Sequence, residues 1–474
     1  MADQLSALDA SFLEIEEQDD ASHMHVGWAM VFDRLPGAGG ESTAPSAQDV
    51  MDQVEVRLNA LPRFRERLSR PHSGGLSRPS WEPDERFDVA NHVKLAALPS
   101  PGGEKELMEW LGDFWSHRLD RALPLWELAL VSGLADGRWA LVTKTHHSLV
   151  DGMSGVDVTN LLLDATPDAQ WPPENGEAKG EDAAESSPGQ PWWALRAARA
   201  GAGVLTHPRR SAGDILRGGR AVLDLIVHEE LVGAPPTSLN VSISGTRRFA
   251  VARSDLNEMK AVKGALGGTF NDVVLAAVTG ALRAFLQQRG DELPDRALRA
   301  MVPVSLRSSG EEGTLGNRVS SLFVDLPVAT SDPAARYAEV MAAAEELKAG
   351  SQAVGSDLLV RTSGLVPPAV HALALRTMFS PRLFNLTITN IPGPPRTLYA
   401  FGAPMREVLP LVPVFAQHAV GIAVVSYAGG VYFGLNADSV SVRDLDVLSR
   451  AIEESIAELV ATAGKARPRP SPVR

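Results

Sequence analysis

Apolar and polar positions along the chain follow two different spacings. The segments 27–33 (GWAMVFD) and 138–147 (RWALVTKTHH) contain short apolar runs and predict β-strands. Between them, residues 104–120 (EKELMEWLGDFWSHRLD) carry apolar side chains every three or four positions, which predicts an amphipathic helix. Residues 270–289 show the same spacing, and Gly290 supplies a C-terminal stop.

The last part of the chain repeats this alternation. Strands are predicted at residues 385–390 (NLTITN), 418–427 (HAVGIAVVSY) and 430–436 (GVYFGLN), and a terminal helix at 442–464. No short internal repeat is present. Strands therefore alternate with helices in two regions, which predicts an α/β (α+β) protein made of two mixed-sheet halves.

Changes in composition divide the chain. Residues 1–163 form a first ordered region and residues 246–464 a second. Residues 164–245 between them begin as a Pro-, Gly-, Ser- and acid-rich linker and continue as a basic helical connector. Residues 465–474 (KARPRPSPVR) are expected to be a disordered tail.

The basic part of the connector, Trp192–Arg220, carries six arginines against a single acid, Asp214. Two adjacent tryptophans open it, and indole rings favour the membrane interface, where arginines are attracted to anionic lipids. Its glycines and Pro208 interrupt any single long helix. Two interpretations stay open: a lipid-surface contact, or a connector whose apolar side chains pack onto the protein.

Charge and cysteine content exclude several classes of protein. The formal net charge is −13, from 58 acidic and 45 basic residues, and such a field disfavours nucleic-acid binding. The chain has no cysteine, which excludes disulfides, thiolate nucleophiles and Cys-rich zinc sites. The acidic start is unlike a secretory signal, and residues 411–433 predict two strands and a turn rather than a membrane span. We expect a cytoplasmic protein that can also lie peripherally on a membrane or lipid-droplet surface.

The segment HHSLVDG carries the clearest chemistry. His146 and His147 end a predicted strand, so alternation directs their side chains to opposite faces. Asp151 and Gly152 follow in a predicted loop, where Gly152 allows a sharp turn. Imidazole can accept a proton at neutral pH. A metal site from these histidines and Asp151 is disfavoured because adjacent histidines on a strand diverge and HExxH is absent; G-x-S-x-G is absent too.

HHSLVDG fits HHxxxDG, the signature of the coenzyme-A-dependent acyltransferase superfamily. Further segments resemble bacterial wax ester synthase/diacylglycerol acyltransferases and follow the family order from about residue 5 to 460. These segments are LSALDASFLEIE (5–16), MHVGWAMVFD (24–33), PLWE (124–127), TFNDVVLAAVTGALR (269–283), VPVSLR (302–307), GNRVS (316–320), TNIPGP (389–394) and SYAGGVYFGL (426–435).

The resemblance implies a fold of two similar mixed-sheet domains, of the chloramphenicol-acetyltransferase-like kind, that meet at a cleft or tunnel. It implies an O-acyltransferase that moves a long-chain acyl group from acyl-CoA to diacylglycerol, a long-chain fatty alcohol, or both. By match to the motif, His147 is the general base and no covalent intermediate forms. No cofactor is implied beyond acyl-CoA as co-substrate.

The resemblance also implies roles around the base. His146 supports the loop. Asp151, the motif's carboxylate, is structural and pairs with an arginine, for which Arg65 is the first candidate by position and Arg63 and Arg67 compete. A turn-capping role for Asp151 is the alternative.

Three other segments are candidate substrate contacts. Pro124, Leu125 and Trp126 form a wall of the acyl channel, or else a strand that simply buries the tryptophan. Asn271 and Asp272 act at the cleft, or else form a helix N-terminus with Asn271 as cap.

The last candidate segment contains Asn390 and Gly393 of NIPGP, which line the cleft or form a rigid turn.

Two other functions are alternatives to the acyl-CoA-dependent transfer that the family resemblance implies. One is a stand-alone condensation-type acyltransferase that uses a carrier-protein thioester. The other is a catalytically silent lipid-binding protein. The family-ordered matches argue against the first, and the intact histidine motif argues against the second.

Overall fold

The computed structural model of the chain describes residues 3–5, 7–35, 44–69, 79–149, 162–169, 233–305, 319–350 and 382–465. The predicted site residues Asp151 and Gly152 lie outside these ranges, as does the basic stretch Trp192–Arg220.

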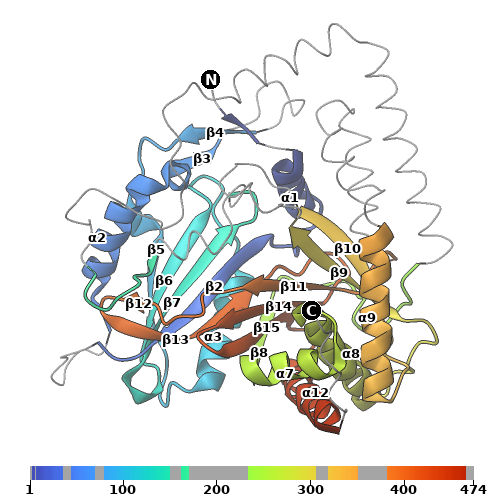
Figure 1. The fold of residues 1–474 in the computed structure, drawn as a ribbon. Coiled ribbons are helices and arrows are strands. Elements are labelled where there is room, and N and C mark those ends of the chain that lie inside the picture. The colour runs from blue at the N-terminus through green and yellow to red at the C-terminus, as the bar shows by residue number, and fades with distance from the viewer. Residues whose placement is uncertain are drawn as a thin grey trace, which may run out of the picture.

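Two six-stranded sheets dominate the described structure (Figure 1). The first has the order β12-β13-β2-β7-β6-β5 and the second β10-β9-β11-β14-β15-β8, while β1, β4 and β3 form a small third sheet. Strands of the first sheet are β2 (His25–Phe32), β5 (Val93–Ala97), β6 (Trp126–Ser132), β7 (Trp139–His146), β12 (Tyr399–Ala400) and β13 (Ala403–Leu411). Strands of the second are β8 (Arg247–Asp255), β9 (Leu298–Ser305), β10 (Val319–Leu326), β11 (Leu386–Pro392), β14 (Val420–Tyr427) and β15 (Gly430–Asp438). The small sheet contains β1 (Asp3–Gln4), β3 (Glu66–Leu68) and β4 (Ser80–Pro83).

Both large sheets are mixed. Strand pairs β5–β6, β9–β11 and β11–β14 are parallel, and the other pairs are antiparallel. The predicted α/β (α+β) class with two mixed sheets is therefore confirmed.

Helices cover the sheets in separate layers. α7 (Leu256–Leu266), α8 (Phe270–Arg289), α9 (Pro333–Gly350) and α12 (Leu445–Lys465) pack with the second sheet around one apolar core. α1 (Ala7–Gln18) and α2 (Ala47–Arg57) contribute to the core on one face of the first sheet. α3 (Glu104–Ser116) packs between the first sheet and β8 of the second. Short 3₁₀ turns complete this part of the chain: η1 (Leu58–Ala60), η2 (Pro62–Arg65), η3 (Val89–Asn91) and η4 (Ala135–Gly137).

The helix predictions hold, with two corrections at their ends. The helix predicted over 104–120 ends at Ser116, because His117 adopts an extended backbone conformation. α8 ends as predicted at Gly290, which has the left-handed conformation with φ of 79°. Its N-cap is Thr269 rather than Asn271: the Thr269 side chain accepts from the Asp272 N–H, and the Asp272 carboxylate accepts from the Thr269 N–H, a reciprocal capping box.

One feature of the topology was not predicted from the sequence pattern. β12 and β13 come from residues 399–411, late in the chain, yet β13 pairs with β2 in the first sheet, with Leu411 opposite Gly27. β13 also lies close to β15 of the second sheet, where a Cβ built on Gly434 would fall 1.8 Å from the Pro410 carbonyl oxygen. A strand from the second half of the chain therefore joins the two sheets. The predicted boundaries at 163, 245 and 464 stay a prediction.

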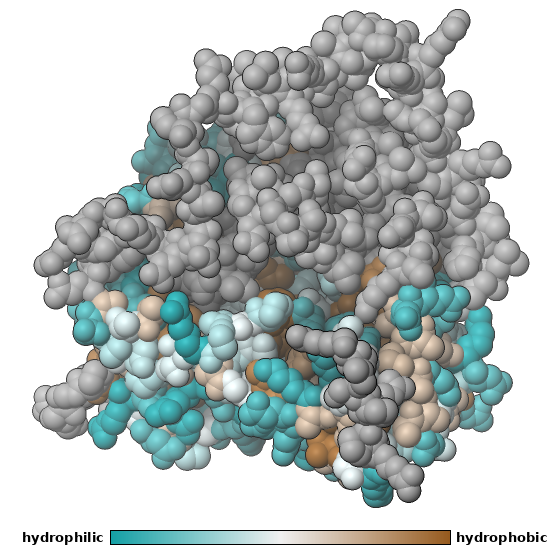
Figure 2. Space-filling view, in the orientation of Figure 1, coloured by the Kyte–Doolittle hydropathy of each residue, from teal (hydrophilic) through white to brown (hydrophobic). Residues whose placement is uncertain are grey.

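The described surface visible in Figure 2 is mainly hydrophilic or of intermediate hydropathy, and strongly apolar residues appear there in small separate areas. The large apolar side chains that are exposed among the described residues, Val56, Leu95 and Val440, lie on different elements. Within the described ranges, no single helix is long and apolar enough to cross a bilayer. The bent pair of α7 and α8 meets that test jointly, but most of α8 is buried in the core.

Candidate active site

The two motif histidines stand at the end of β7, between β2 and β6. The His146 N–H donates to the Leu125 carbonyl on the β6 side at 2.9 Å, and the His147 N–H donates to the Met24 carbonyl on the β2 side at 2.8 Å. Successive backbone N–H groups that point to opposite neighbours are the pattern of an extended strand, so the two side chains diverge. The predicted divergence is confirmed.

The His147 ring lies where the two halves of the molecule meet. It is half-buried and stacks on Phe12 of α1, with ring centroids 4.1 Å apart. Phe12 belongs to a small apolar cluster that includes Met24 beside β2 and Met301 of β9 in the second sheet. The ring therefore stands at the junction of the two sheets.

His146 is buried and held in one tautomer. Its Nδ1 accepts from the Ser148 N–H at 3.1 Å and lies 2.6 Å from the Ser148 hydroxyl oxygen. Because Nδ1 accepts, the ring proton of the neutral form sits on Nε2. Nε2 lies 3.4 Å from a carboxylate oxygen of Glu16. His146 therefore faces Glu16, whereas His147 lies at the junction of the two sheets.

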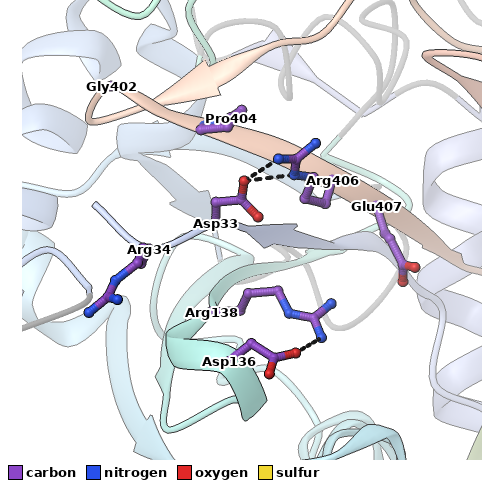
Figure 3. Close-up of a pocket in the computed structure, with 8 residues that line it drawn as sticks. All are labelled: Asp33, Arg34, Asp136, Arg138, Gly402, Pro404, Arg406 and Glu407. Atoms are coloured by element: carbon purple, nitrogen blue, oxygen red, sulfur yellow. Dashed lines mark hydrogen bonds and ion pairs between the residues drawn. The ribbon is translucent and has the colours of Figure 1, made fainter. Parts of the chain in front are cut away.

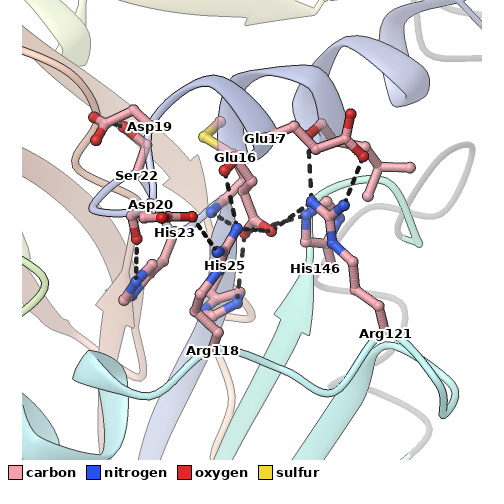
Figure 4. A network of polar contacts seen from close by, with 12 residues as sticks. Glu16, Glu17, Asp19, Asp20, Ser22, His23, His25, Arg118, Arg121 and His146 are labelled. Carbon is pink, nitrogen blue, oxygen red and sulfur yellow. Dashed lines mark hydrogen bonds and ion pairs between the residues drawn. The ribbon is translucent and has the colours of Figure 1, made fainter.

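Glu16 of α1 is the centre of a polar network around this histidine (Figure 4). Its side chain is 3% exposed, and it accepts the Met24 N–H at 2.8 Å. Arg121 and Arg118 contact its second oxygen at 3.0 and 3.4 Å. Burial alone would raise the pKa of this carboxyl, but His146, His25 and the Met24 N–H together hold the pKa well below its usual range. The carboxylate is therefore ionised at neutral pH.

Glu16 is not among the residues that the sequence predicts to act at the site. It lies in the matched segment LSALDASFLEIE, but nothing in an acidic helix end (EIEEQDD) distinguishes a buried carboxylate from exposed ones. A detectable signal was its position four residues after Phe12, because residues i and i+4 share one face of a helix.

Two other buried bases flank the network and are held neutral. Burial lowers the pKa of His25 well below its usual range, and Lys144 adds to this effect. Burial also lowers the pKa of His23, to about 4, assisted by Arg247. Lys144 itself is fully buried, with Nζ 3.0 Å from the Phe114 and His117 carbonyl oxygens and 2.8 Å from Glu127.

The PLW segment is structurally tied to the motif. The Leu125 carbonyl accepts the His146 N–H, and Pro124, Leu125 and Trp126 are all buried. The Trp126 Nε1–H donates to the Phe64 carbonyl at 2.8 Å, and the indole ring stacks on His92. The interpretation of a strand that buries Trp126 is confirmed, while a role in an acyl channel stays a prediction.

An apolar cavity lies beside this segment. Thr143 and Thr145, which line it, alternate along β7 with Lys144 and His146 and therefore share the side of the strand to which His147 points. The cavity's other lining residues come from α2, the 3₁₀ turns after it, β6 and one later residue: Val54, Arg57, Leu58, Leu61, Phe64, Trp126, Glu127, Leu128 and Leu162. It offers apolar surface within two residues of the histidine motif.

The arginines proposed as partners of Asp151 all have carboxylate partners within the described structure. Arg65 Nη2 lies 2.6 Å from Glu55 and its guanidinium stacks over Phe87. Arg63 pairs with Glu66, and Arg67 pairs with Glu82. Since Asp151 lies outside the described residues, its pairing with Arg65 stays a prediction.

Asn271 and Asp272 stand at the start of α8. Asp272 is 2% exposed and its carboxylate caps the helix through Thr269, while Asn271, half-buried, is not the cap. Asn271 loses that role because Thr269 is the residue with the extended backbone conformation that a cap requires. The contacts described for Asp272 lie within this cap and beside Tyr337. A substrate role for either residue stays a prediction.

Asn390 and Gly393 differ from the predicted turn or loop. β11 continues through Asn390 to Pro392 and pairs in parallel with β14, with Asn390 opposite Val424. The expected turn is therefore wrong for residues 390–392. β9 pairs with β11 only at Leu386 and Thr387, so the missing N–H of Pro392 interrupts no ladder on that side. At Gly393 a Cβ would fall 2.2 Å from the Ser426 carbonyl oxygen, so the close approach to β14 requires glycine.

A second, polar pocket of about 670 Å³ lies elsewhere on the first sheet (Figure 3). Its arginines Arg138 and Arg406 pair with Asp136 and Asp33. Asp33 follows the last residue of β2, whereas His25 at its first residue lies opposite His146. At ~3.3 Å per residue the pocket is roughly 25 Å from the histidines, so it is not part of the same site. Among the described residues, no group of three or more histidine, aspartate or glutamate side chains is arranged to hold a metal ion.

Comparison with known proteins decides the family. The profile of the wax ester synthase/diacylglycerol acyltransferase catalytic domain matches residues 5–274, and that of the family's C-terminal domain matches residues 315–460. The chain belongs to the wax ester synthase/diacylglycerol acyltransferase family. It is 32% identical over 464 residues to a probable diacylglycerol O-acyltransferase, tgs1, of Mycobacterium tuberculosis, and the match covers 96% of each chain.

Solved structures of similar fold agree with this assignment. The wax ester synthase/diacylglycerol acyltransferase of Marinobacter aquaeolei VT8 superposes with a TM-score of 0.68 at 29% identity, covering 97% of this acyltransferase and 100% of that chain. The starter condensation domain of rhizomide synthetase has a TM-score of 0.57 at 14% identity, covering 98% of this chain and 95% of that one. The latter similarity concerns the fold alone. The predicted family and its two-domain acyltransferase fold are confirmed.

Proposed function

We propose that this acyltransferase transfers a long-chain acyl group from acyl-CoA to the hydroxyl of diacylglycerol, or of a long-chain fatty alcohol, with His147 as general base. The observation that carries the proposal is the placement of His147. Its ring is half-buried at the junction of the two sheets, stacks on Phe12, and shares a strand face with an apolar cavity. A basic nitrogen beside apolar surface suits a reaction between two lipid-bearing substrates.

The proposed reaction is a direct transfer. His147 accepts the proton of the acceptor hydroxyl while its oxygen attacks the thioester carbonyl, and the tetrahedral intermediate expels the coenzyme A thiolate. The imidazolium then donates its proton to that thiolate, so the base returns to its neutral form with the ester and free coenzyme A as products. A positioned base of this kind contributes about 10²–10⁴-fold to the rate.

His146 has a supporting role in this proposal. Its Nδ1 accepts from Ser148 and its Nε2 faces Glu16, so both ring nitrogens face groups of the protein. The PLW segment supports the motif as well, through the bond from the His146 N–H to the Leu125 carbonyl. We further propose that Trp126 contacts the acyl chain or the lipid acceptor.

The proposal needs no cofactor beyond acyl-CoA as co-substrate. Purified enzyme dialysed against EDTA should keep its full turnover. A loss of turnover that is restored by one added metal ion would contradict this part of the proposal.

Turnover assays test the function directly. Purified enzyme receives palmitoyl-CoA with diacylglycerol or with hexadecanol, and coenzyme A release and ester formation are measured separately. Ester formation that depends on palmitoyl-CoA and on either acceptor supports the proposal. Turnover only with a carrier-protein thioester would favour a condensation-type enzyme, and lipid binding without turnover would favour a silent lipid-binding protein.

We propose in addition that the enzyme is cytoplasmic and associates peripherally with a lipid surface, where its insoluble products can accumulate. The basic composition of Trp192–Arg220 supports this. Co-sedimentation with anionic vesicles should fall at high salt and in a variant with its six arginines changed to Gln. Equal sedimentation of that variant, or binding indifferent to lipid charge, would contradict the proposal.

A further inference from the structure

Glu16 is a buried carboxylate that the transfer reaction itself does not require. It contacts the Met24 peptide before β2, His146 at the end of β7, and Arg118 and Arg121 in the segment after α3 (Figure 4). It also lies 3.7 Å from His25, the residue opposite His146 in the β2–β7 pair. A buried charge is costly unless its surroundings compensate it, and here every surrounding segment supplies a donor or a cation.

We propose that Glu16 is a positioning residue that holds the end of β7, and with it the base His147, in register with β2. The inference rests on the proposed role of His147. Glu16 does not touch substrate in this account; it acts through Met24 and His146.

The first connection runs through one peptide unit on each side of Met24. The Met24 N–H donates to Glu16 at 2.8 Å, and the Met24 carbonyl accepts the His147 N–H, also at 2.8 Å. The β2–β7 pairing itself ends at His25 and His146. The His147–Met24 bond thus extends that ladder by one step, and Glu16 holds the residue that accepts it.

The second connection runs through His146. The Ser148 N–H donates to Nδ1, which leaves the proton of the neutral ring on Nε2, 3.4 Å from the Glu16 oxygen. Without the carboxylate, a buried Nε2–H would face the neighbouring ring of His25 instead. Rotation of His146 to find another acceptor would break its bond to Ser148, directly after His147 in the chain.

Three carboxylates pair with Arg118 and Arg121, and Glu16 is the buried one. Arg118 also pairs with Asp20, and Arg121 with Glu17, whose side chains are 97% and 65% exposed. Arg118 also donates to the Glu16 backbone carbonyl, and Arg121 donates to the Leu13 backbone carbonyl; both carbonyls belong to α1. Cations near a helix C-terminus are favourable, so the pair fixes the end of α1 against the segment that leads into PLW. The outer carboxylates are exposed and contribute little by comparison.

The same helix face holds both histidines. Phe12 and Glu16 are four residues apart on α1; Phe12 stacks on His147 and Glu16 faces His146. A displacement of α1 would therefore move the support of both rings together. Misplacement of a catalytic group by about 1 Å can cost about 10²-fold in rate.

The test compares Glu16→Gln with Glu17→Gln. Gln keeps the size of the side chain and can still accept the Met24 N–H, but it carries no charge for the arginines or His146. Glu17, the next residue, pairs with the same Arg121 at the surface and serves as the matched control. We expect kcat of Glu16→Gln to fall about 10- to 100-fold with KM for palmitoyl-CoA and for the acceptor within about twofold of wild type, and Glu17→Gln to match wild type.

Two further measurements separate positioning from a loss of folding. Hydrogen exchange should show lost protection confined to residues 145–149, with the Met24 N–H, which Gln can still bond, and the second sheet unchanged. In a Glu16→Gln/His146→Ala double variant, the losses in kcat should not multiply if Glu16 acts through His146. Global loss of protection, multiplying losses, or a wild-type kcat in Glu16→Gln would overturn the inference.

The result for His147→Ala in the same assay keeps the two proposals distinct. If His147→Ala is inactive and Glu16→Gln has wild-type kcat, only the positioning role is wrong. If His147→Ala retains wild-type turnover, the proposed base is wrong, whatever Glu16 does.

Discussion

The imidazole ring of His147 stacks on the phenyl ring of Phe12, with centroids 4.1 Å apart and planes inclined by 29°. The contact joins the end of β7 to a helix more than a hundred residues earlier in the chain. It packs against one face of the ring, so α1 as well as the strand constrains the plane of the ring.

Replacement of the base should abolish transfer. We expect His147→Ala to lower kcat/KM by about 10²-fold or more, the contribution typical of a positioned general base. The measurement is ester formation from palmitoyl-CoA, and the melting temperature checks that the fold is intact. His146→Ala should lose less, since its ring faces Glu16; equal losses would show that the two histidines do not have separate roles.

Replacement of the stacking partner should have a graded effect. Phe12→Leu keeps an apolar side chain against His147 but removes an aromatic pair worth about 0.5–1.5 kcal/mol. Because ~1.4 kcal/mol corresponds to a factor of ten, kcat should fall by a few-fold to about tenfold. Phe32→Leu removes a different stacked pair, that with Trp139 in the core. That variant should lose thermal stability with kcat per folded enzyme unchanged; identical behaviour of the two would argue against the role of Phe12.

The ion pair between Arg57 and Asp164 should stabilise the fold. The two groups lie 2.7 Å apart, and their side chains are 3% and 11% exposed. Loss of one member of a buried pair typically costs about 3–5 kcal/mol, so Asp164→Asn should lower the free energy of unfolding by that amount or less, which a lower urea midpoint would show. Asp168→Asn, a few residues away and exposed, should leave the midpoint unchanged. An unchanged midpoint for Asp164→Asn would show that the pair contributes nothing net.

Acid should destabilise the enzyme through its buried histidines. Burial lowers the pKa of His418 to about 4, and likewise that of His23. Such a group contributes its full stability above the unfolded pKa of ~6.5 and loses it as pH falls from there to about 4. At 1.36 kcal/mol per pKa unit this amounts to about 3 kcal/mol for His418. Urea unfolding between pH 7 and 4.5 should show a shallower loss for His418→Gln than for wild type, and parallel curves would contradict the assignment.

Gly434 of β15 lies too close to β13 for any side chain to fit there. A Cβ there would fall 1.8 Å from the Pro410 carbonyl oxygen, on β13. Gly434→Ala should therefore destabilise the fold by about 1–3 kcal/mol, the usual cost of overpacking. Gly264→Ala in α7, where a Cβ meets nothing within 4 Å, should stabilise it slightly because alanine favours helix. A Gly434→Ala variant as stable as wild type would show that the junction adapts.

Local patterns alone determined much of this protein. The amphipathic spacing of residues 104–120 and 270–289 located α3 and α8, because a helix that packs on a sheet needs an apolar stripe every 3–4 residues. Alternation at the end of β7 was enough to separate His146 from His147. The motif and the family-ordered segments were enough to name the family and its chemistry, since they are properties of the chain and not of its folding.

Only the tertiary structure decided which distant groups surround the base. Asn271 loses the cap to Thr269 because backbone conformation selects between neighbouring cap residues. β13 enters the first sheet because β2 offers an open edge, which no local periodicity reveals. Glu16 resembles its exposed neighbours in sequence, and its burial follows from the docking of α1 against β2, β7 and the segment after α3. Long-range packing assigns such roles, because the electrostatic environment of a carboxylate depends on partners far away in the chain.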